Sequence, residues 1–458
     1  MTEIPETRWA RTVDGACIAY QDIGEGPVTL LVVHGWVSHL EVYWEQPRYV
    51  RFLTRLSRNM RVLVFDKRGI GMSDRVSGTA DLSVLLDDVR AVMDAAGVDK
   101  AALLGWGGPG PELPAFFAAT YPERTLCLAM NGGIHAREEP NYPWAKSPEA
   151  FEEGLARVLR TWGSEVGAAD FVRAGYSDEP PDSAPYNDPA FLRWNAKLAR
   201  YAATPASYEA FERMWFETDV RAALRAISAP TAWFFTEGDQ EDEEWARAHA
   251  GFVPGARAVP VATPPAVIWV PEPEPMVAAI ESFIASVRQE EAELDRMLAT
   301  VLFTDVVGST DKACELGDRA WAELLERHHL TVRALLARYR GREVSTAGDG
   351  FLATFDGPAR AVKCAQGICE AVKPLGLEVR AGCHTGEIEL LGADVGGIAV
   401  HIGARVGALA GPSEVLVSST VKDLVAGSGL AFTDRGEHKL KGVPETWHLY
   451  AVAAPGTQ

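Results

Sequence analysis

The sequence predicts two α/β domains in one chain, a larger N-terminal domain built on a parallel sheet and a smaller C-terminal domain. Three observations support this fold class. At 458 residues the chain exceeds what one hydrophobic core usually supports. In the first half, short apolar runs alternate with helical patterns, which is typical of a parallel sheet with crossover helices. After the charged stretch 288–298, a different alternation of strands and helices begins.

The composition limits the class of protein and its partners. Hydrophobic residues make up 47% and charged residues 23% of the chain, and no apolar run approaches the roughly 18 residues that span a bilayer. The N-terminus lacks the pattern of a secretory signal, so we expect a soluble, cytoplasmic protein. The formal net charge of -19 argues against nucleic-acid and membrane partners. The six cysteines lack C-x-x-C spacing, which disfavours a zinc site or a disulfide framework.

The N-terminal domain is expected over residues 1–287. Its strands are predicted at four short apolar runs: Val28–Val33, Val62–Phe65, Ala101–Leu104 and Thr231–Phe235. Between about 136 and 226 the strand pattern stops, and aromatic residues recur among helix formers. We therefore predict a helical cap that lies over the sheet.

The C-terminal domain is expected over residues 299–454. The preceding linker, 288–298, is charged and lacks turn residues, so it is predicted to be helical. Val301–Thr304 is expected to be a strand, and apolar residues from Trp321 to Tyr339 recur at helical spacing. Two further short segments, Glu343–Ser345 and Phe351–Phe355, flank a tight turn, which predicts a hairpin.

Two aspartates lie where these elements end. Asp305 ends the strand, and Asp349 lies in the hairpin turn. Two carboxylates with room for substrate phosphates suit Mg²⁺ or Mn²⁺, and two such ions about 3.5 to 4 Å apart can activate a hydroxyl and hold a leaving pyrophosphate. Gly308, Ser309 and Thr310 lead into a helical pattern, so their backbone amides are candidate phosphate ligands.

Candidate cationic groups follow further along the chain. A short helical pattern places His401 and Arg405 four residues apart, hence on one face. An arginine directed at a phosphorus centre stabilises the charge that develops on its oxygens. Lys441 is a candidate for binding the terminal phosphates. Each of these residues alone also fits an ordinary role as a cap, a turn former or a solvated charge, so the interpretation depends on their joint order.

That order closely resembles the class III adenylyl/guanylyl cyclase catalytic domain, from about Ala299 to Val452. The matching series is Phe303-Thr-Asp-Val-Val-Gly-Ser-Thr310, Thr346-Ala-Gly-Asp-Gly350, Asp394-Val-Gly-Gly397, His401-x-x-x-Arg405, Arg435-Gly436 and Leu440-Lys-Gly442. The resemblance implies a ferredoxin-like α/β sandwich that pairs head to tail in a homodimer. It also implies conversion of ATP to 3′,5′-cyclic AMP and pyrophosphate.

The resemblance implies a role for each matching residue. Asp305 and Asp349 would hold two divalent metal ions, with the Val306 carbonyl as a further ligand. Arg405 would stabilise the transition state and Lys441 would bind the polyphosphate, both from the second chain.

Two positions depart from the family pattern. Ser345 occupies the position at which adenine-selective members carry a lysine and guanine-selective members carry a glutamate. In adenine-selective members that lysine pairs with an aspartate on the base, and Asp394 occupies the position of this aspartate. Asp394 alone therefore favours ATP as the main substrate and GTP as a minor one. Losing the hydrogen bond of the lysine should reduce the selectivity for ATP over GTP roughly tenfold. His401 replaces the asparagine that positions the ribose. Because a neutral imidazole still donates one hydrogen bond, we expect reduced turnover.

Three N-terminal motifs resemble the α/β-hydrolase fold, over roughly Trp9 to Val287. They are Val32-Val-His-Gly-Trp36, Phe65-Asp-Lys-Arg-Gly-Ile-Gly-Met-Ser-Asp74 and Leu104-Gly-Trp-Gly-Gly-Pro-Gly110. The third corresponds to the family's nucleophile elbow, Gly-x-Ser-x-Gly, and Gly107 occupies the serine position. Asp239 stands at the position of the triad acid, and Ala266 aligns with the histidine. Without nucleophile and base we expect no acyl transfer, with Asp239 as a turn or cap carboxylate.

The leading hypothesis is therefore an adenylyl cyclase regulated by a silent hydrolase-like domain. The cup under its aromatic cap would accept an apolar small molecule. Two alternatives stay open: a degenerate cyclase that acts as a non-catalytic ligand sensor, and an α/β-hydrolase with a tethered dimerisation domain.

Overall fold

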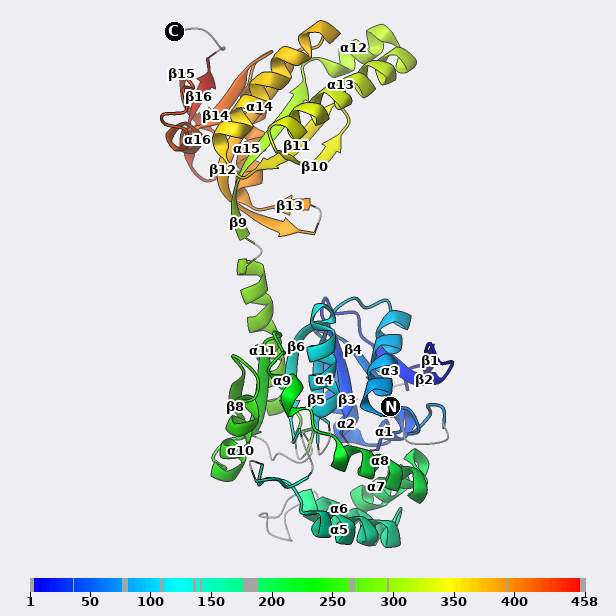
Figure 1. Ribbon diagram of the computed structural model, residues 1–458. Coiled ribbons are helices and arrows are strands. Elements are labelled where there is room, and N and C mark those ends of the chain that lie inside the picture. Colours follow the sequence, from blue (N-terminus) through cyan, green and yellow to red (C-terminus); the bar gives the residue numbers. More distant parts are fainter. Residues whose placement is uncertain are drawn as a thin grey trace. The chain divides into compact units, whose positions relative to one another are not determined.

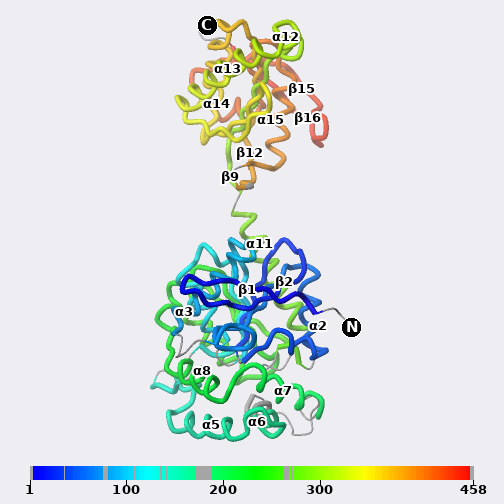
Figure 2. Tube along the Cα trace, turned by 90° about the vertical axis from the view of Figure 1, so that its right-hand side faces the viewer, coloured from blue at the N-terminus to red at the C-terminus, as the bar shows by residue number. Residues whose placement is uncertain are grey.

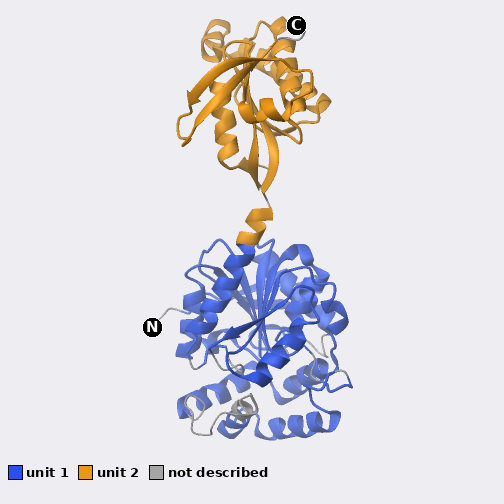
Figure 3. Cartoon of the chain, turned by 90° about the vertical axis from the view of Figure 1, so that its left-hand side faces the viewer, with its two compact units in different colours: residues 1–288 blue, residues 289–458 orange. Residues whose placement is uncertain are grey.

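A computed structural model of the chain describes residues 4–35, 37–75, 81–107, 110–134, 137–140, 142–175, 188–262, 268–270, 272–294, 296–392 and 394–453. The chain forms two compact units, residues 1–288 and 289–458 (Figure 3). Each unit has its own sheet and its own hydrophobic clusters. No described helix is long and apolar enough to cross a membrane.

The N-terminal unit is built on a mixed sheet in the order β1-β2-β4-β3-β5-β6-β7-β8 (Figure 1). Its strands are β1 (Arg8–Arg11), β2 (Cys17–Ile23), β3 (Thr29–His34), β4 (Arg61–Phe65), β5 (Ala101–Trp106), β6 (Thr125–Asn131), β7 (Thr231–Thr236) and β8 (Arg257–Val261). β1 pairs antiparallel with β2 and β2 with β4, whereas the other neighbouring strands of the sheet are parallel, so the parallel strands predicted from the apolar runs are confirmed.

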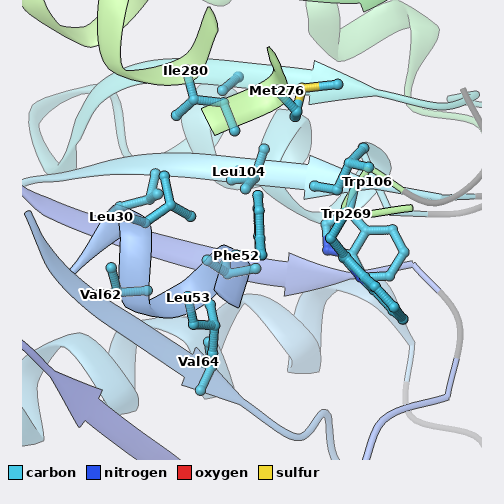
Figure 4. Close-up of a cluster of buried hydrophobic side chains, with 14 of the residues drawn as sticks. Leu30, Phe52, Leu53, Val62, Val64, Leu104, Trp106, Trp269, Met276 and Ile280 are labelled. Carbon is cyan, nitrogen blue, oxygen red and sulfur yellow. The ribbon is translucent and has the colours of Figure 1, made fainter. Parts of the chain in front are cut away.

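Helices cover both faces of this sheet. They are α1 (Leu40–Tyr43), α2 (Pro47–Leu56), α3 (Leu82–Ala95), α4 (Glu112–Thr120), η1 (Pro122–Arg124), α5 (Pro148–Thr161), α6 (Glu165–Gly175), α7 (Pro189–Ala202), α8 (Pro205–Glu217), α9 (Arg221–Leu224), α10 (Gln240–Ala250) and α11 (Glu274–Leu294). Because successive side chains of a strand point to opposite faces, Leu30 and Val32 join a cluster with α2 and α11 (Figure 4). Leu31 and Val33 join a second cluster with α3 and α4.

Of the helices that follow β6 and precede β7, α5 to α8 form the predicted cap, whereas α9 packs against α4 beside the sheet. Figures 1 and 2 show α5 to α8 gathered at one side of the N-terminal sheet. Their aromatic residues pack against one another: the rings of Phe151 and Phe216 stack at 3.9 Å, and those of Trp162 and Tyr208 at 4.2 Å. The aromatic residues seen in the sequence therefore hold the cap helices together.

The C-terminal unit is an α/β sandwich with the strand order β10-β11-β9-β12-β14-β16-β15, and β13 pairs with β12. Its elements are β9 (Arg296–Val306), α12 (Ser309–Leu316), α13 (Asp318–Arg338), β10 (Arg342–Ala347), β11 (Gly350–Phe355), α14 (Pro358–Ala371), η2 (Lys373–Leu375), β12 (Val379–Leu391), β13 (Asp394–Gly396), α15 (Ile398–Leu409), β14 (Val415–Ser418), α16 (Ser419–Leu424), β15 (Phe432–Lys439) and β16 (Thr446–Val452). Leu302 of β9 packs with α13, α14 and α16, whereas Val301 packs with α15 on the opposite face.

The helix expected over the linker 288–298 is shorter than predicted. α11 ends at Leu294, and β9 already begins at Arg296. Met297 and Leu298 pair with Ile388 and Glu387 of β12. Pairing with a neighbouring strand overrides the local helical pattern at this point.

Candidate active site

The first strand and the first hairpin of the C-terminal unit bring two carboxylates together. β11 pairs antiparallel with β9, so the turn between β10 and β11 lies beside the end of β9. Gly348 supplies the left-handed φ of 63° that the turn needs. The Val306 N–H donates to Oδ2 of Asp349 at 2.9 Å, next to Asp305 in the chain. Two residues far apart in sequence thus meet at one end of the sheet.

Arg380, which the sequence analysis missed, joins this pair from β12. It is the register partner of Asp305, and its Nε–H donates to Oδ2 of Asp305 at 3.0 Å. The two side chains are 35% and 43% exposed, so the ion pair contributes only about 0 to 1 kcal/mol to stability. Its significance is that it places a positive charge beside the two carboxylates, where a polyphosphate would be attracted.

The carboxylates fit a divalent metal ion. Oδ2 of Asp305 bonds to Arg380 and Oδ2 of Asp349 to Val306, whereas neither Oδ1 accepts a hydrogen bond from a described residue. Two hard oxygen ligands therefore remain available. Among the described residues no three His, Cys, Asp or Glu side chains converge on a metal position. The rest of a coordination shell would come from backbone oxygens, water or substrate, as is usual for Mg²⁺.

A cavity of about 290 Å³ lies beside these residues. Its lining consists of Phe303, Thr304, Asp305, Ser345, Ala347, Gly350, Phe351, Leu352, Arg380, Ala404, Gly407 and Ala408. The register of β10 shifts between Glu343 and Ser345, a β-bulge that redirects the strand just where Ser345 enters the lining. Ser345, the predicted base-reading residue, and Asp305, one of the predicted metal ligands, thus line one cavity.

The other predicted residues lie outside this lining. His401 and Arg405 are exposed on one face of α15, because Ile402 and Val406 bury the opposite face. Asp394 is exposed on β13, where its Oδ1 accepts from the Val395 N–H. Exposed Lys441 lies between β15 and β16, and Gly308, Ser309 and Thr310 form the start of α12.

In the N-terminal unit, the predicted triad positions hold no catalytic pair. Gly107 follows β5 with a φ of 79°, and a Cβ there would meet only Gly35 Cα, at 3.8 Å. The turn therefore has the sharp left-handed geometry and the space of an elbow, without a nucleophile. Asp239 caps α10, with Oδ1 accepting from the Asp242 N–H at 3.0 Å. Ala266 lies outside the described residues, and the sequence has no histidine between His249 and Arg288.

Aromatic rings fill the space near this elbow. Trp269 is 2% exposed, and its ring centroid lies 6.4 Å from that of Trp106 (Figure 4). The ring centroid of Trp194 in the cap lies 5.8 Å from that of Trp269. His34 Nε2 hydrogen-bonds the Tyr49 hydroxyl at 2.9 Å, and burial lowers the pKa of His34 to about 3. The imidazole of His34 is therefore neutral and already bonded, which makes it unsuited to replace the missing base.

Comparison with known proteins assigns both units. Residues 295–453 match the family model described as adenylate and guanylate cyclase catalytic domain. The C-terminal unit contains a class III cyclase domain. Residues 28–242 match the model of the α/β hydrolase fold, so the chain joins a hydrolase-fold domain to a cyclase domain.

Individual relatives agree with this division. Putative adenylate cyclase 3 of Rhizobium meliloti (strain 1021) is 28% identical over 165 residues, 34% of this chain and 28% of that protein. This chain thus spans less than a third of that relative. The bifunctional esterase/perhydrolase DCH of Acinetobacter calcoaceticus is 27% identical over 241 residues, 51% of this chain and 82% of that protein. The structure of esterase EaEST from Exiguobacterium antarcticum covers 61% of this chain and 100% of its own, at 17% identity and a TM-score of 0.51, a likeness of fold.

Within the cyclase domain, the structure therefore divides the predicted residues into two groups. Asp305 and Ser345 line the cavity, and Val306, which follows Asp305 in the chain, is hydrogen-bonded to Asp349. His401, Arg405, Asp394 and Lys441 lie on exposed surfaces outside it. Arg380 had no separate signal in the sequence, because only the pairing of β12 with β9 places it opposite Asp305.

Proposed function

We propose that the cyclase domain converts ATP to 3′,5′-cyclic AMP and pyrophosphate. The observation that supports this most is the meeting of Asp305 and Asp349, each with an available Oδ1, beside a cavity that also contains Arg380. The arrangement combines hard ligands for metal ions with a cation for phosphate oxygens.

The two carboxylates would hold two divalent ions, Mg²⁺ or Mn²⁺, with the Val306 carbonyl as a further ligand. When bound, such ions lower the pKa of an attacking hydroxyl and neutralise phosphate charge. Asp305 and Asp349 fix where the triphosphate lies. Gly308, Ser309 and Thr310 present backbone groups at the start of α12, where an anion is favoured.

The remaining roles require a second copy of the chain. Arg405 is exposed and lies outside the cavity of its own chain, which supports the proposal that it serves the site of a partner. In a homodimer, Arg405 would bind the oxygens on which charge builds during attack of the ribose 3′-hydroxyl on the α-phosphorus. His401, on the same face, would orient the ribose, and Lys441 would bind the terminal phosphates. Removing one donor of this kind typically costs about 10²–10³ in kcat.

We infer ATP rather than GTP as the main substrate. Asp394 retains the acceptor for the adenine amino group, whereas Ser345 offers only a neutral hydroxyl where a lysine would be expected. The loss is one hydrogen bond, worth about 0.5 to 1.5 kcal/mol, so the selectivity for ATP over GTP should be roughly tenfold lower than with lysine at this position, without being reversed.

The hydrolase-fold domain would act as a regulator without acyl-transfer activity of its own. Gly107 and the missing histidine remove nucleophile and base, and Asp239 is engaged as a helix cap. The aromatic cap supports an apolar small molecule as the class of ligand, with Trp269 restricting the space next to the elbow.

The test is an assay of the purified full chain with Mn²⁺ and ATP, then with GTP, detecting cyclic nucleotide by chromatography. We expect cyclic AMP to exceed cyclic GMP and Asp305→Asn, an isosteric variant, to abolish both. Absence of any cyclic product from the folded protein would refute the enzyme and leave the non-catalytic sensor in its place.

A further inference from the structure

Two consecutive histidines of α13 reach the hairpin turn that carries Asp349. His328 Nε2 lies 3.2 Å from the backbone oxygen of Asp349, and His329 Nε2 lies 2.9 Å from that of Gly348. The Phe351 ring lies edge-on to both imidazoles, with centroids 5.9 and 5.2 Å away. Neither histidine belongs to the motifs that predict the site.

The chemistry of these contacts fixes the tautomer of His328. A carbonyl oxygen only accepts, so Nε2 must carry the proton and donate. His328 is fully buried, and burial lowers its pKa, so the ring is neutral at pH 7. Nδ1 is then a buried acceptor, and within the described residues it has no partner. The ring thus leaves one nitrogen unsatisfied while its other nitrogen bonds the turn.

Strand pairing holds the two ends of the turn, Ala347 and Gly350, and leaves Gly348 and Asp349 at its tip. Gly348 has a φ of 63°, and a glycine, which has no Cβ, restricts the backbone less than any other residue at this position. The Val306 N–H fixes one oxygen of the Asp349 carboxylate, and His328 fixes the carbonyl of the same residue. Together these two bonds set the direction in which Oδ1 of Asp349 points.

We propose that His328, assisted by His329, is a positioning residue that orients Asp349 and thereby sets the metal affinity of the site. The proposal rests on the proposed function, in which Asp349 is a metal ligand. Partners that orient a ligand typically change metal affinity by about tenfold or more when removed. Loss of His328 should therefore weaken metal binding while nucleotide KM at saturating metal stays close to wild type.

The experiment titrates the full chain with Mn²⁺ and measures free Mn²⁺ by electron paramagnetic resonance. His328→Phe keeps the ring but removes the donor, and we expect a dissociation constant roughly tenfold higher. His328→Gln retains an N–H donor at similar reach and should return most of the affinity. The matched control is His384→Phe, because His384 is buried in the same domain but bonds Ser418 Oγ at 2.8 Å. It should leave Mn²⁺ affinity unchanged.

Each outcome decides between explanations. Wild-type Mn²⁺ affinity in folded His328→Phe, or an equal loss in His384→Phe, would overturn the positioning role. If His328→Phe fails to fold, His329→Ala takes its place, because His329 is only half-buried. An unchanged Mn²⁺ affinity in His329→Ala overturns the proposal as well. Failure of the proposed function looks different, because Asp349→Asn would then leave Mn²⁺ binding unaltered.

Discussion

Mixing two inactive variants tests whether the active site is shared between two chains. Asp305→Ala removes a metal ligand, and Arg405→Ala removes the charge that would stabilise the transition state. Each homodimer should therefore show little or no activity. Arg405 lies outside the cavity that Asp305 lines, so in a two-fold dimer each site would combine Asp305 of one chain with Arg405 of the other.

The size of the recovery follows from that symmetry. In a mixed dimer, one site collects both lesions while the other is intact. With equal amounts and random exchange about half of the dimers are mixed, and each keeps one of its two sites, so activity should reach roughly a quarter of wild type.

The assay measures cyclic AMP after subunit exchange, with exchange itself verified by native mass spectrometry of two differently tagged proteins. The control mixes Asp305→Ala with Asp349→Ala. Both lesions then lie on the metal side, every site is damaged, and no activity should return. Lack of recovery in the first mixture, despite verified exchange, would show that Asp305 and Arg405 act within one chain.

Three further predictions concern single positions. Gly107→Ser should show no turnover of p-nitrophenyl acetate, because a hydroxyl without a base is a poor nucleophile. A serine at the φ of 79° of this position costs only about 1 to 2 kcal/mol, so the variant should fold. Ester hydrolysis by the folded variant would contradict the silent-domain interpretation. Ser345→Lys should raise the ratio of kcat/KM for ATP over GTP roughly tenfold by giving Asp394 its partner, and an unchanged ratio would remove Ser345 from base recognition. Trp269→Ala should lower the free energy of unfolding of the hydrolase-fold domain by about 3 to 5 kcal/mol in urea titration, and a loss below about 1 kcal/mol would mean that the neighbouring rings close the gap.

Strong local patterns made much of the fold predictable. The continuous apolar runs of β3, β4, β5 and β7 indicated buried parallel strands, and the turn around Asp349 indicated a hairpin. β12 escaped notice because its buried alternation uses Val379, Ala381 and Cys383, two of which are small. Glycines at its other positions, which admit α15, weaken the pattern further.

The candidate site was predictable only where the residue itself carried the signal. A carboxylate at a strand end suggests chemistry before any contact is known. The roles of Arg380 and His328 depend on partners from other elements. Arg380 is the register partner of Asp305 on the neighbouring strand, and His328 on a helix contacts the carbonyl of Asp349 in a turn. Spacing along the chain does not encode such meetings. The linker helix ends earlier than predicted for the same reason, because the residues from Arg296 onward pair with β12, which is distant in the sequence.

The glycine contact between β12 and α15 couples two parts of the cyclase domain mechanically. A Cβ on Gly382 would collide with the backbone of Gly407, so strand and helix touch main chain to main chain without a compressible side chain between them. Arg380 lies on the strand and Arg405 on the helix, so the backbone segments that carry the two guanidinium groups are held directly against each other. In the proposed dimer these groups serve different sites. A movement of β12 at one site would therefore be transmitted to α15, the helix that carries Arg405.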